Sequence, residues 1–228
     1  SVWADIADGW TLRGDFDTAV SIYESRVVPV FERANMSSEL ADTLIEVARA
    51  HLTLGQTDEA LALLEGRLEP LIPECRMETR TSLSLLHANL LCNRGRPVEA
   101  RSLVESLLPG LRASGHYLLE TNVLLELADI MYSQGALREA HQVLCDVIIP
   151  RCEAYKYVHE CAVAHHSVAR ILICEGQLHT ALEHLRCQVM PRYEQYQDMR
   201  AIAMVRLEIA KLQWLRGERS ERAGRMSI

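Results

Sequence analysis

The chain has 228 residues, of which 49% are hydrophobic and 24% charged, a composition that excludes disordered, collagen-like and coiled-coil chains. Its net charge of -7 argues against a nucleic-acid binder, because neutralising phosphates requires a basic surface. The longest stretch without a charged residue, from Thr81 to Asn93, is shorter than the roughly 18 apolar residues of a membrane helix. We therefore expect no membrane span.

The cysteines indicate the redox environment. There are seven of them, an odd number, and none lies within six residues of another, which favours free thiols over a disulfide framework. Residues 1–20 carry scattered aspartates and have no basic start followed by an apolar run, so no secretion signal is expected there. Both observations predict a cytoplasmic protein.

Small residues recur with one period along the whole chain. Glycines are spaced by forty or forty-one positions, at Gly14, Gly55, Gly95, Gly135, Gly176 and Gly217. Alanine stands five residues after each of the first five glycines and seven residues before all six. A proline follows each of the first five glycines by fourteen or fifteen positions, at Pro29, Pro70, Pro109, Pro150 and Pro191. Such a period indicates a repeat architecture.

The second unit shows the local structure most clearly. Before Gly55, apolar or bulky residues follow one face of a helix at Leu44, Val47, Ala48, His51 and Leu52. The glycine is predicted to end this helix A, because a left-handed C-terminal conformation suits glycine. A second helix, helix B, follows with Ala60, Leu63, Leu64 and Leu68 facing inward. Alanines on both helices permit a close approach, so each unit is predicted to be a helical hairpin.

The repeated proline leaves two interpretations open. Inside a helix, proline removes one hydrogen bond and clashes with the preceding turn. Either helix B continues past the proline with a kink, or it ends and a short further turn begins with the proline. The kinked helix is favoured, because apolar residues such as Val27, Val28 and Phe31 flank the proline without an intervening glycine.

This pattern resembles the tetratricopeptide repeat (TPR) family. The resemblance covers essentially the whole chain, although the units are longer than the usual repeat of about 34 residues and helix A carries alanine where glycine is usual. The long units are similar to arrays in bacterial signalling proteins. The matching residues are Trp3, Ile6, Ala7, Trp10, Gly14 and Ala19 in the first unit, Val47, Ala48, Gly55, Ala60 and Leu64 in the second, and Leu124, Leu127, Ala128, Gly135, Ala140 and Leu144 in the fourth. The resemblance implies an all-α fold, an α-solenoid in which antiparallel hairpins form a right-handed superhelix.

We expect residues 1–228 to form a single repeat domain of about five and a half hairpins. Helix A of the first unit is predicted to lack its N-terminal turn, and only a short segment follows Gly217. The chain is therefore expected to be part of a longer array, since solenoids usually end in a polar capping helix. Uncovered apolar faces at the two ends predict end-to-end self-association.

The resemblance also implies where a partner binds, since TPR proteins hold peptides on the inner face of successive A helices. Offsets of six and three residues before each glycine, together with His166 one turn before Arg170, predict a groove lined by Arg49, Asn89, Asp129, Tyr132, His166, Arg170, Lys211 and Trp214. The C-terminal half of this set is basic and aromatic, which suits an acidic protein or peptide segment. The alternative is a solvated helix face, which often carries such charges.

No catalytic motif is present in the sequence. It contains no Walker loop, GxGxxG, GxSxG or CxxC, and His159-Glu160 lacks the second histidine of HExxH because Val163 stands in its place. Histidines and cysteines are dense between His141 and Cys187, but without ligand spacing we expect packing roles, with no metal and no cofactor.

The sequence thus predicts a non-catalytic scaffold for protein-protein interaction. The alternative is a ligand-sensing regulatory array of a signal-transduction ATPase or transcription regulator, whose groove would respond to a peptide or small molecule.

Overall fold

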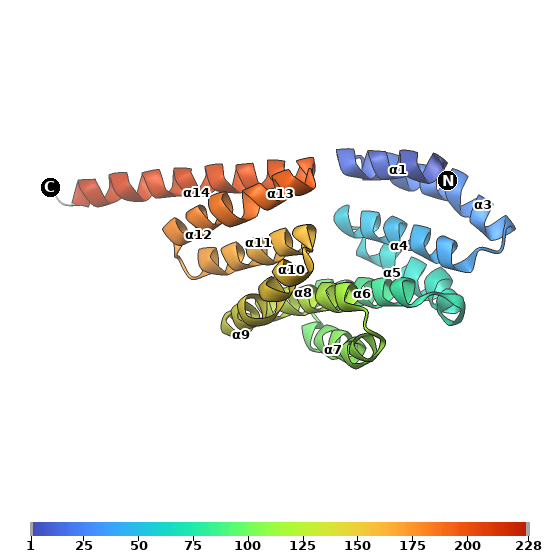
Figure 1. Cartoon of the computed structure of the whole chain (residues 1–228). Helices are drawn as coiled ribbons and strands as arrows, with labels where there is room; N and C mark the ends of the chain where they lie inside the picture. Colours follow the sequence, from blue (N-terminus) through green and yellow to red (C-terminus); the bar gives the residue numbers. More distant parts are fainter. Residues whose placement is uncertain (1, 227–228) are drawn as a thin grey trace. The chain divides into compact units, whose positions relative to one another are not determined.

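A computed structural model describes the backbone of residues 2–226 and the side chains of residues 2–215. Within these residues all regular secondary structure is helical, in agreement with the predicted all-α solenoid (Figure 1). The chain divides into two compact units, residues 1–119 and 120–228, and each is described by itself. That residues 1–228 form a single repeat domain stays a prediction. No described helix is long and apolar enough to cross a membrane.

The first unit contains three helical hairpins. In each, a helix A packs against a helix B. Helix B contains a π segment in the first two hairpins, followed by a 3-10 segment in the second, and is a single α-helix in the third. The elements are α1 (Val2–Arg13), α2 (Phe16–Ile22), η1 (Tyr23–Val27), α3 (Val28–Arg33), α4 (Ser37–Thr53), α5 (Thr57–Leu63), η2 (Leu64–Leu68), η3 (Glu69–Glu74), α6 (Met77–Asn93) and α7 (Pro97–Ser114).

The second unit continues the same pattern. It contains two complete hairpins, the first of which begins with the helix A α8, and a long last helix (Figure 1). The elements are α8 (Tyr117–Ser133), α9 (Leu137–Val143), η4 (Leu144–Ile148), α10 (Ile149–Tyr155), α11 (Val158–Cys174), α12 (Leu178–His184), η5 (Leu185–Val189), α13 (Met190–Tyr196) and α14 (Met199–Met226).

Five of the six periodic glycines end a helix A as predicted. Their φ angles are positive, between +73° and +83°, a conformation that costs glycine little. At Gly55 the glycine N–H donates to the Leu52 carbonyl, and the Gln56 N–H donates to the His51 carbonyl. This is the paired bonding of a Schellman motif, and the other four glycines repeat it.

The sixth glycine behaves differently. Gly217 was expected to separate two helices, but α14 continues through it from Met199 to Met226. Within the described residues no helix B returns over α14, so Ala210 is exposed where the corresponding alanines of the earlier A helices are buried. The predicted half repeat is therefore one continuous helix.

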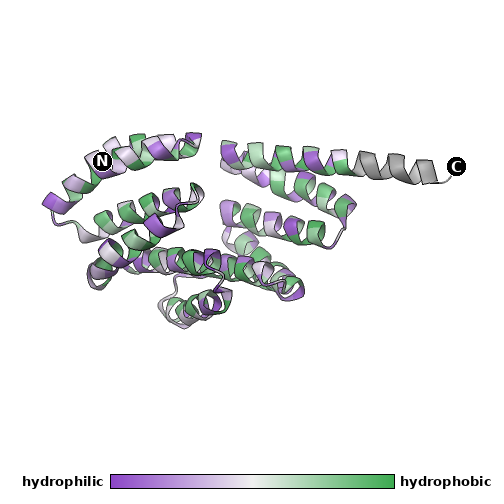
Figure 2. Ribbon diagram, turned by 180° about the vertical axis from the view of Figure 1, so that it is seen from behind, coloured by the Kyte–Doolittle hydropathy of each residue, from purple (hydrophilic) through white to green (hydrophobic). Residues whose placement is uncertain are grey.

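The periodic alanines form the contact between helices A and B. Those seven residues before the first five glycines are at most 2% exposed, and those five residues after them are fully buried. In Figure 2 the helices carry both apolar and polar residues, so each helix can pack its apolar side against neighbouring helices. The alanine contact set is Ala7, Ala48, Ala88, Ala128 and Ala169 on the A helices and Ala19, Ala60, Ala100, Ala140 and Ala181 on the B helices.

The periodic proline lies within a continuous helix B in the first, third, fourth and fifth units, as the favoured interpretation expected. Before Pro150 the chain forms a π turn, in which the Ile149 N–H donates to the Leu144 carbonyl five residues back. The same bond precedes Pro29, Pro70 and Pro191. Pro70 itself lies in the 3-10 segment η3, into which the helix tightens from Glu69. A π turn adds one residue to the helix, which moves the proline ring relative to the preceding carbonyls.

The spacing of the prolines explains which units carry the π turn. Pro109 follows its glycine by fourteen positions, and α7 is α-helical throughout. The other four prolines follow by fifteen positions, and each is preceded by a π turn. The additional residue is thus the one that the π turn absorbs.

Candidate functional site

A hollow of about 540 Å³ lies on one face of the second unit, between consecutive A helices. Helices α8, α11 and α14 form its walls. Its lining residues are Asp129, Tyr132, Val163, His166, Ser167, Arg170, Ile173, Met204 and Glu208. Four of the eight predicted groove residues, all from α8 and α11, therefore lie in one hollow.

Arg170 is held between a carboxylate and an aromatic ring. Its Nη1 lies 2.9 Å from Oδ1 of Asp129 on the neighbouring helix, and its guanidinium carbon lies 4.4 Å from the centroid of the Tyr132 ring. The Arg170 side chain is 39% exposed, so solvent weakens the ion pair while the cation–π contact fixes the orientation of the guanidinium.

His166 has an acidic partner that the sequence reasoning did not include. Its Nε2 lies 2.8 Å from Oε2 of Glu208 on α14. Asp129 and Glu208 together supply two negative charges against the single permanent charge of Arg170. The hollow is therefore not the basic surface expected from offsets six and three, because those offsets omitted Glu208.

Tyr132 makes a second contact with α11, in addition to its contact with Arg170. Its hydroxyl lies 2.9 Å from Sγ of Cys174, and this hydrogen bond, together with burial, raises the pKa of the tyrosine. Tyr132 is thus a neutral, positioned ring beneath Arg170 at physiological pH.

The remaining predicted residues do not line this hollow. Lys211 and Trp214 are exposed on α14, beyond Glu208. Arg49 and Asn89 belong to the first unit, where Arg49 forms an exposed ion pair with Glu46 and Asn89 is exposed.

The first unit has its own, more acidic hollow of about 270 Å³. Asp8, Asp42 and Glu46 line it, and the Tyr23 hydroxyl donates a hydrogen bond to Asp8. Burial raises the pKa of Glu46, with Arg49 partly opposing it. The two units therefore present different charge at equivalent positions.

The missed residues extend the predicted stripe by two helical turns. Glu208 lies nine positions before Gly217, and Val163 and Met204 lie thirteen positions before their glycines. Because residues three or four apart share a helix face, offsets thirteen, ten, nine, six and three form one continuous stripe. Extending the offsets would have located these residues.

A second group of side chains lies near α10 and α11. Glu153, Cys161 and His165 each place a ligand atom within 4.8 Å of the others, and they come from the segment where the sequence is dense in cysteine and histidine. These three residues have the donor atoms to hold a metal ion.

Comparisons with known proteins agree with this architecture. Residues 43–65 match the family model of the tetratricopeptide repeat, which covers the end of α4, Gly55 and α5. The repeats are of the tetratricopeptide type. No curated protein sequence matches the chain.

Solved structures show the same TPR fold over most of the chain. A Podosopora anserina structure described as kinesin light chain nearly identical TPR-like repeats is 22% identical, with a TM-score of 0.56, and the match covers 86% of this chain and 95% of that one. A single-substitution variant of the same protein is 23% identical, with a TM-score of 0.57 and the same coverage. This likeness concerns the fold.

Proposed function

We propose that this TPR protein is a non-catalytic scaffold that binds a protein or peptide segment in the hollow of its second unit. The observation that carries the proposal is Arg170, half-exposed at the hollow and held by both Asp129 and Tyr132. A pre-oriented guanidinium loses little freedom on binding. Apolar surface from Val163 and Met204 lies beside it, which suits a peptide rather than a purely ionic ligand.

The charges of the hollow favour a partner with one acidic group. A guanidinium has five donor hydrogens, so a peptide carboxylate can bind Arg170 in addition to Asp129 or in its place. A second carboxylate on the peptide would meet Asp129 or Glu208 and be repelled. We therefore propose a segment with a single Asp, Glu or C-terminal carboxylate beside apolar residues, not an acidic run.

Removing the charge of Arg170 should reduce the preference for an acidic peptide. The probe is a set of nine-residue peptides, each with one Asp or Glu among apolar residues, and a matched set with Asn or Gln. We expect Arg170→Gln to weaken binding of the acidic set by about 1.4-fold to fivefold, because a solvent-accessible ion pair contributes about 0.2 to 1 kcal/mol. Fluorescence anisotropy of labelled peptides measures the change.

The matched control is Arg186→Gln, an exposed arginine on η5 that does not line the hollow. An equal loss in this control would place binding elsewhere. If small metabolites bind the chain and none of the peptides does, the alternative function, a sensing array of a signalling protein, is favoured instead.

We also propose that the chain associates end to end with a second copy. Helix α14 exposes Leu207 and Trp214 by more than half, and α1 exposes Val2 and Trp3. Ala203 and Ala210, on the adjoining side of α14, are exposed, whereas the residues at their positions on the earlier A helices are buried, so this side of α14 can receive a helix.

Sedimentation velocity over a range of concentrations tests this association. We expect Leu207→Glu to shift the chain toward monomer, because it places a charge in an apolar contact. Val98→Glu, at a position equally open on α7, should have no effect. A chain that stays monomeric at high concentration would contradict the proposal.

The seven cysteines are free thiols, which supports a reducing, cytoplasmic setting as part of this proposal.

A further inference from the structure

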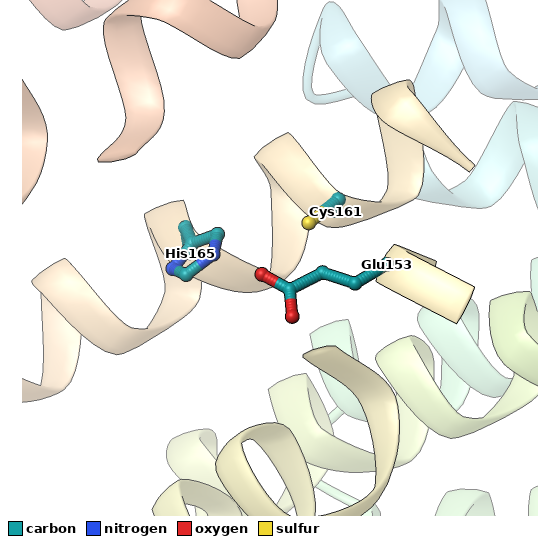
Figure 3. Close-up of side chains that lie close together, drawn as sticks. All are labelled: Glu153, Cys161 and His165. Atoms are coloured by element: carbon teal, nitrogen blue, oxygen red, sulfur yellow. The ribbon is translucent and has the colours of Figure 1, made fainter. Parts of the chain in front are cut away.

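A group of metal-ligating side chains lies in the second unit, separate from the peptide hollow. Cys161 and His165 are four residues apart on α11 and share one face of that helix. Figure 3 shows the carboxylate of Glu153 reaching between them from a neighbouring helix, which is α10. One ligand atom from each residue lies within 4.8 Å of the other two.

His165 is the buried member with an unused ring nitrogen. The residue is only 7% exposed, and its Nε2 has no hydrogen-bond partner among the described residues. Its Nδ1 lies 3.1 Å from Nε2 of His184, at the end of α12. Burying a polar nitrogen without a partner is unfavourable, so this arrangement calls for a ligand.

Burial and nearby charges act on both histidines of this group. Burial, with smaller effects from Arg192 and His184, lowers the pKa of His165 to about 4. Burial and Arg192 also lower the pKa of His184.

We propose that Glu153, Cys161 and His165 form a site for Zn²⁺ or a similar soft divalent ion, with His184, whose Nε2 adjoins His165, as a candidate fourth ligand. Thiolate, imidazole and carboxylate are the ligands that zinc takes in proteins. A tetrahedral shell requires ligand atoms about 3.3 to 3.8 Å apart, so side-chain adjustments of about 1 Å complete the site. Binding displaces the thiol proton of Cys161 to solvent.

The bound ion would connect two consecutive repeats. Glu153 lies in helix B of the fourth unit, Cys161 and His165 in helix A of the fifth, and His184 in its helix B. A solenoid is held only by contacts between neighbours, so a metal at this point would stabilise the interface between these repeats.

Arg192 is the competing cation. Its Nη2 lies 3.5 Å from Oε1 of Glu153, and its Nη1 donates hydrogen bonds to Gln188. A metal ion and this guanidinium cannot both pair fully with one carboxylate, because the two cations repel each other. We therefore expect Arg192→Gln to bind zinc more tightly than the parent.

The test uses the whole chain, reduced and freed of metal with a chelator. Calorimetric titration with Zn²⁺ should give one ion per chain, and Co²⁺ should produce the thiolate-to-metal charge-transfer absorption of a cysteine ligand. We expect Cys161→Ser to abolish that absorption and weaken Zn²⁺ binding by at least about tenfold. Cys187→Ser, which changes an exposed thiol, is the matched control and should behave as the parent.

Glu153→Gln gives a second, independent measurement. The Glu153 side chain is exposed and not part of the core, so this variant should fold even if Cys161→Ser fails to fold. It should also weaken Zn²⁺ binding by about tenfold. The site is overturned if the parent chain binds no Zn²⁺. It is also overturned if Glu153→Gln and Cys161→Ser bind as tightly as the parent, since the ion then lies elsewhere.

Discussion

Glu120→Ala should lower the free energy of unfolding by about 3 kcal/mol. Glu120 is only 1% exposed near the start of α8, and its Oε2 lies 2.7 Å from Nη1 of Arg151 on α10. Removing the carboxylate leaves the guanidinium partly buried without its counter-charge, which typically costs about 3 to 5 kcal/mol. The lower part of that range applies, because the Arg151 side chain is 23% exposed and keeps some hydration. Urea unfolding followed by circular dichroism measures the change.

Two comparison variants separate charge burial from other effects. Glu32→Ala breaks an ion pair with Arg67 whose side chains are 50% and 39% exposed, and it should cost about 0 to 1 kcal/mol. The double variant Glu120→Ala with Arg151→Leu should recover part of the loss, since no uncompensated charge remains. A Glu120→Ala chain as stable as the parent would mean that Arg151 finds water or another partner.

The repeat architecture was predictable because its determinants are local. A glycine at each helix C-terminus and an alanine at each helix crossing are imposed by backbone conformation and side-chain volume, so they appear directly in the sequence. Gly217 shows the limit of this reasoning. Where the structure describes no returning helix, the same glycine lies inside α14.

The proline spacing contained information that the sequence reasoning did not use. Glycine and proline are fourteen positions apart in one repeat and fifteen in the other four, and the single additional residue corresponds to the π turn. An insertion of one residue in a helix must be absorbed by widening it, because otherwise every later side chain would turn by about 100° and leave its neighbour.

The candidate site was only partly predictable, because it depends on contacts between repeats. Arg170, Asp129, Tyr132 and His166 share the hollow as their register indicates, but their net charge is decided by partners in the neighbouring repeats. The same reason applies to Glu120, because nothing in the sequence indicates that it lies opposite Arg151. It also applies to the metal cluster, where a dense run of cysteine and histidine gives no indication of which three residues converge.

Leu144→Ala should lower the free energy of unfolding by about 2 to 5 kcal/mol, because the lost side chain leaves a cavity. Leu144 is fully buried, nine residues after Gly135, and Tyr23, Leu64, Val104 and Leu185 occupy the same register with at most 3% exposure. This position fills the space between the helices of each hairpin. Its carbonyl also accepts the bond of the π turn, which the substitution leaves in place.

The loss should be local as well as large. In a repeat protein each hairpin contacts only its neighbours, so hydrogen exchange should accelerate most in α9, η4, α10 and α11, which contact one another around Leu144. Val147→Ala is the matched control, since this side chain is 40% exposed on the same helix and should change stability by no more than about 0.5 kcal/mol. If Leu144→Ala accelerated exchange equally along the whole chain, the repeats would unfold as one cooperative unit, and the neighbour-by-neighbour description of this solenoid would be wrong.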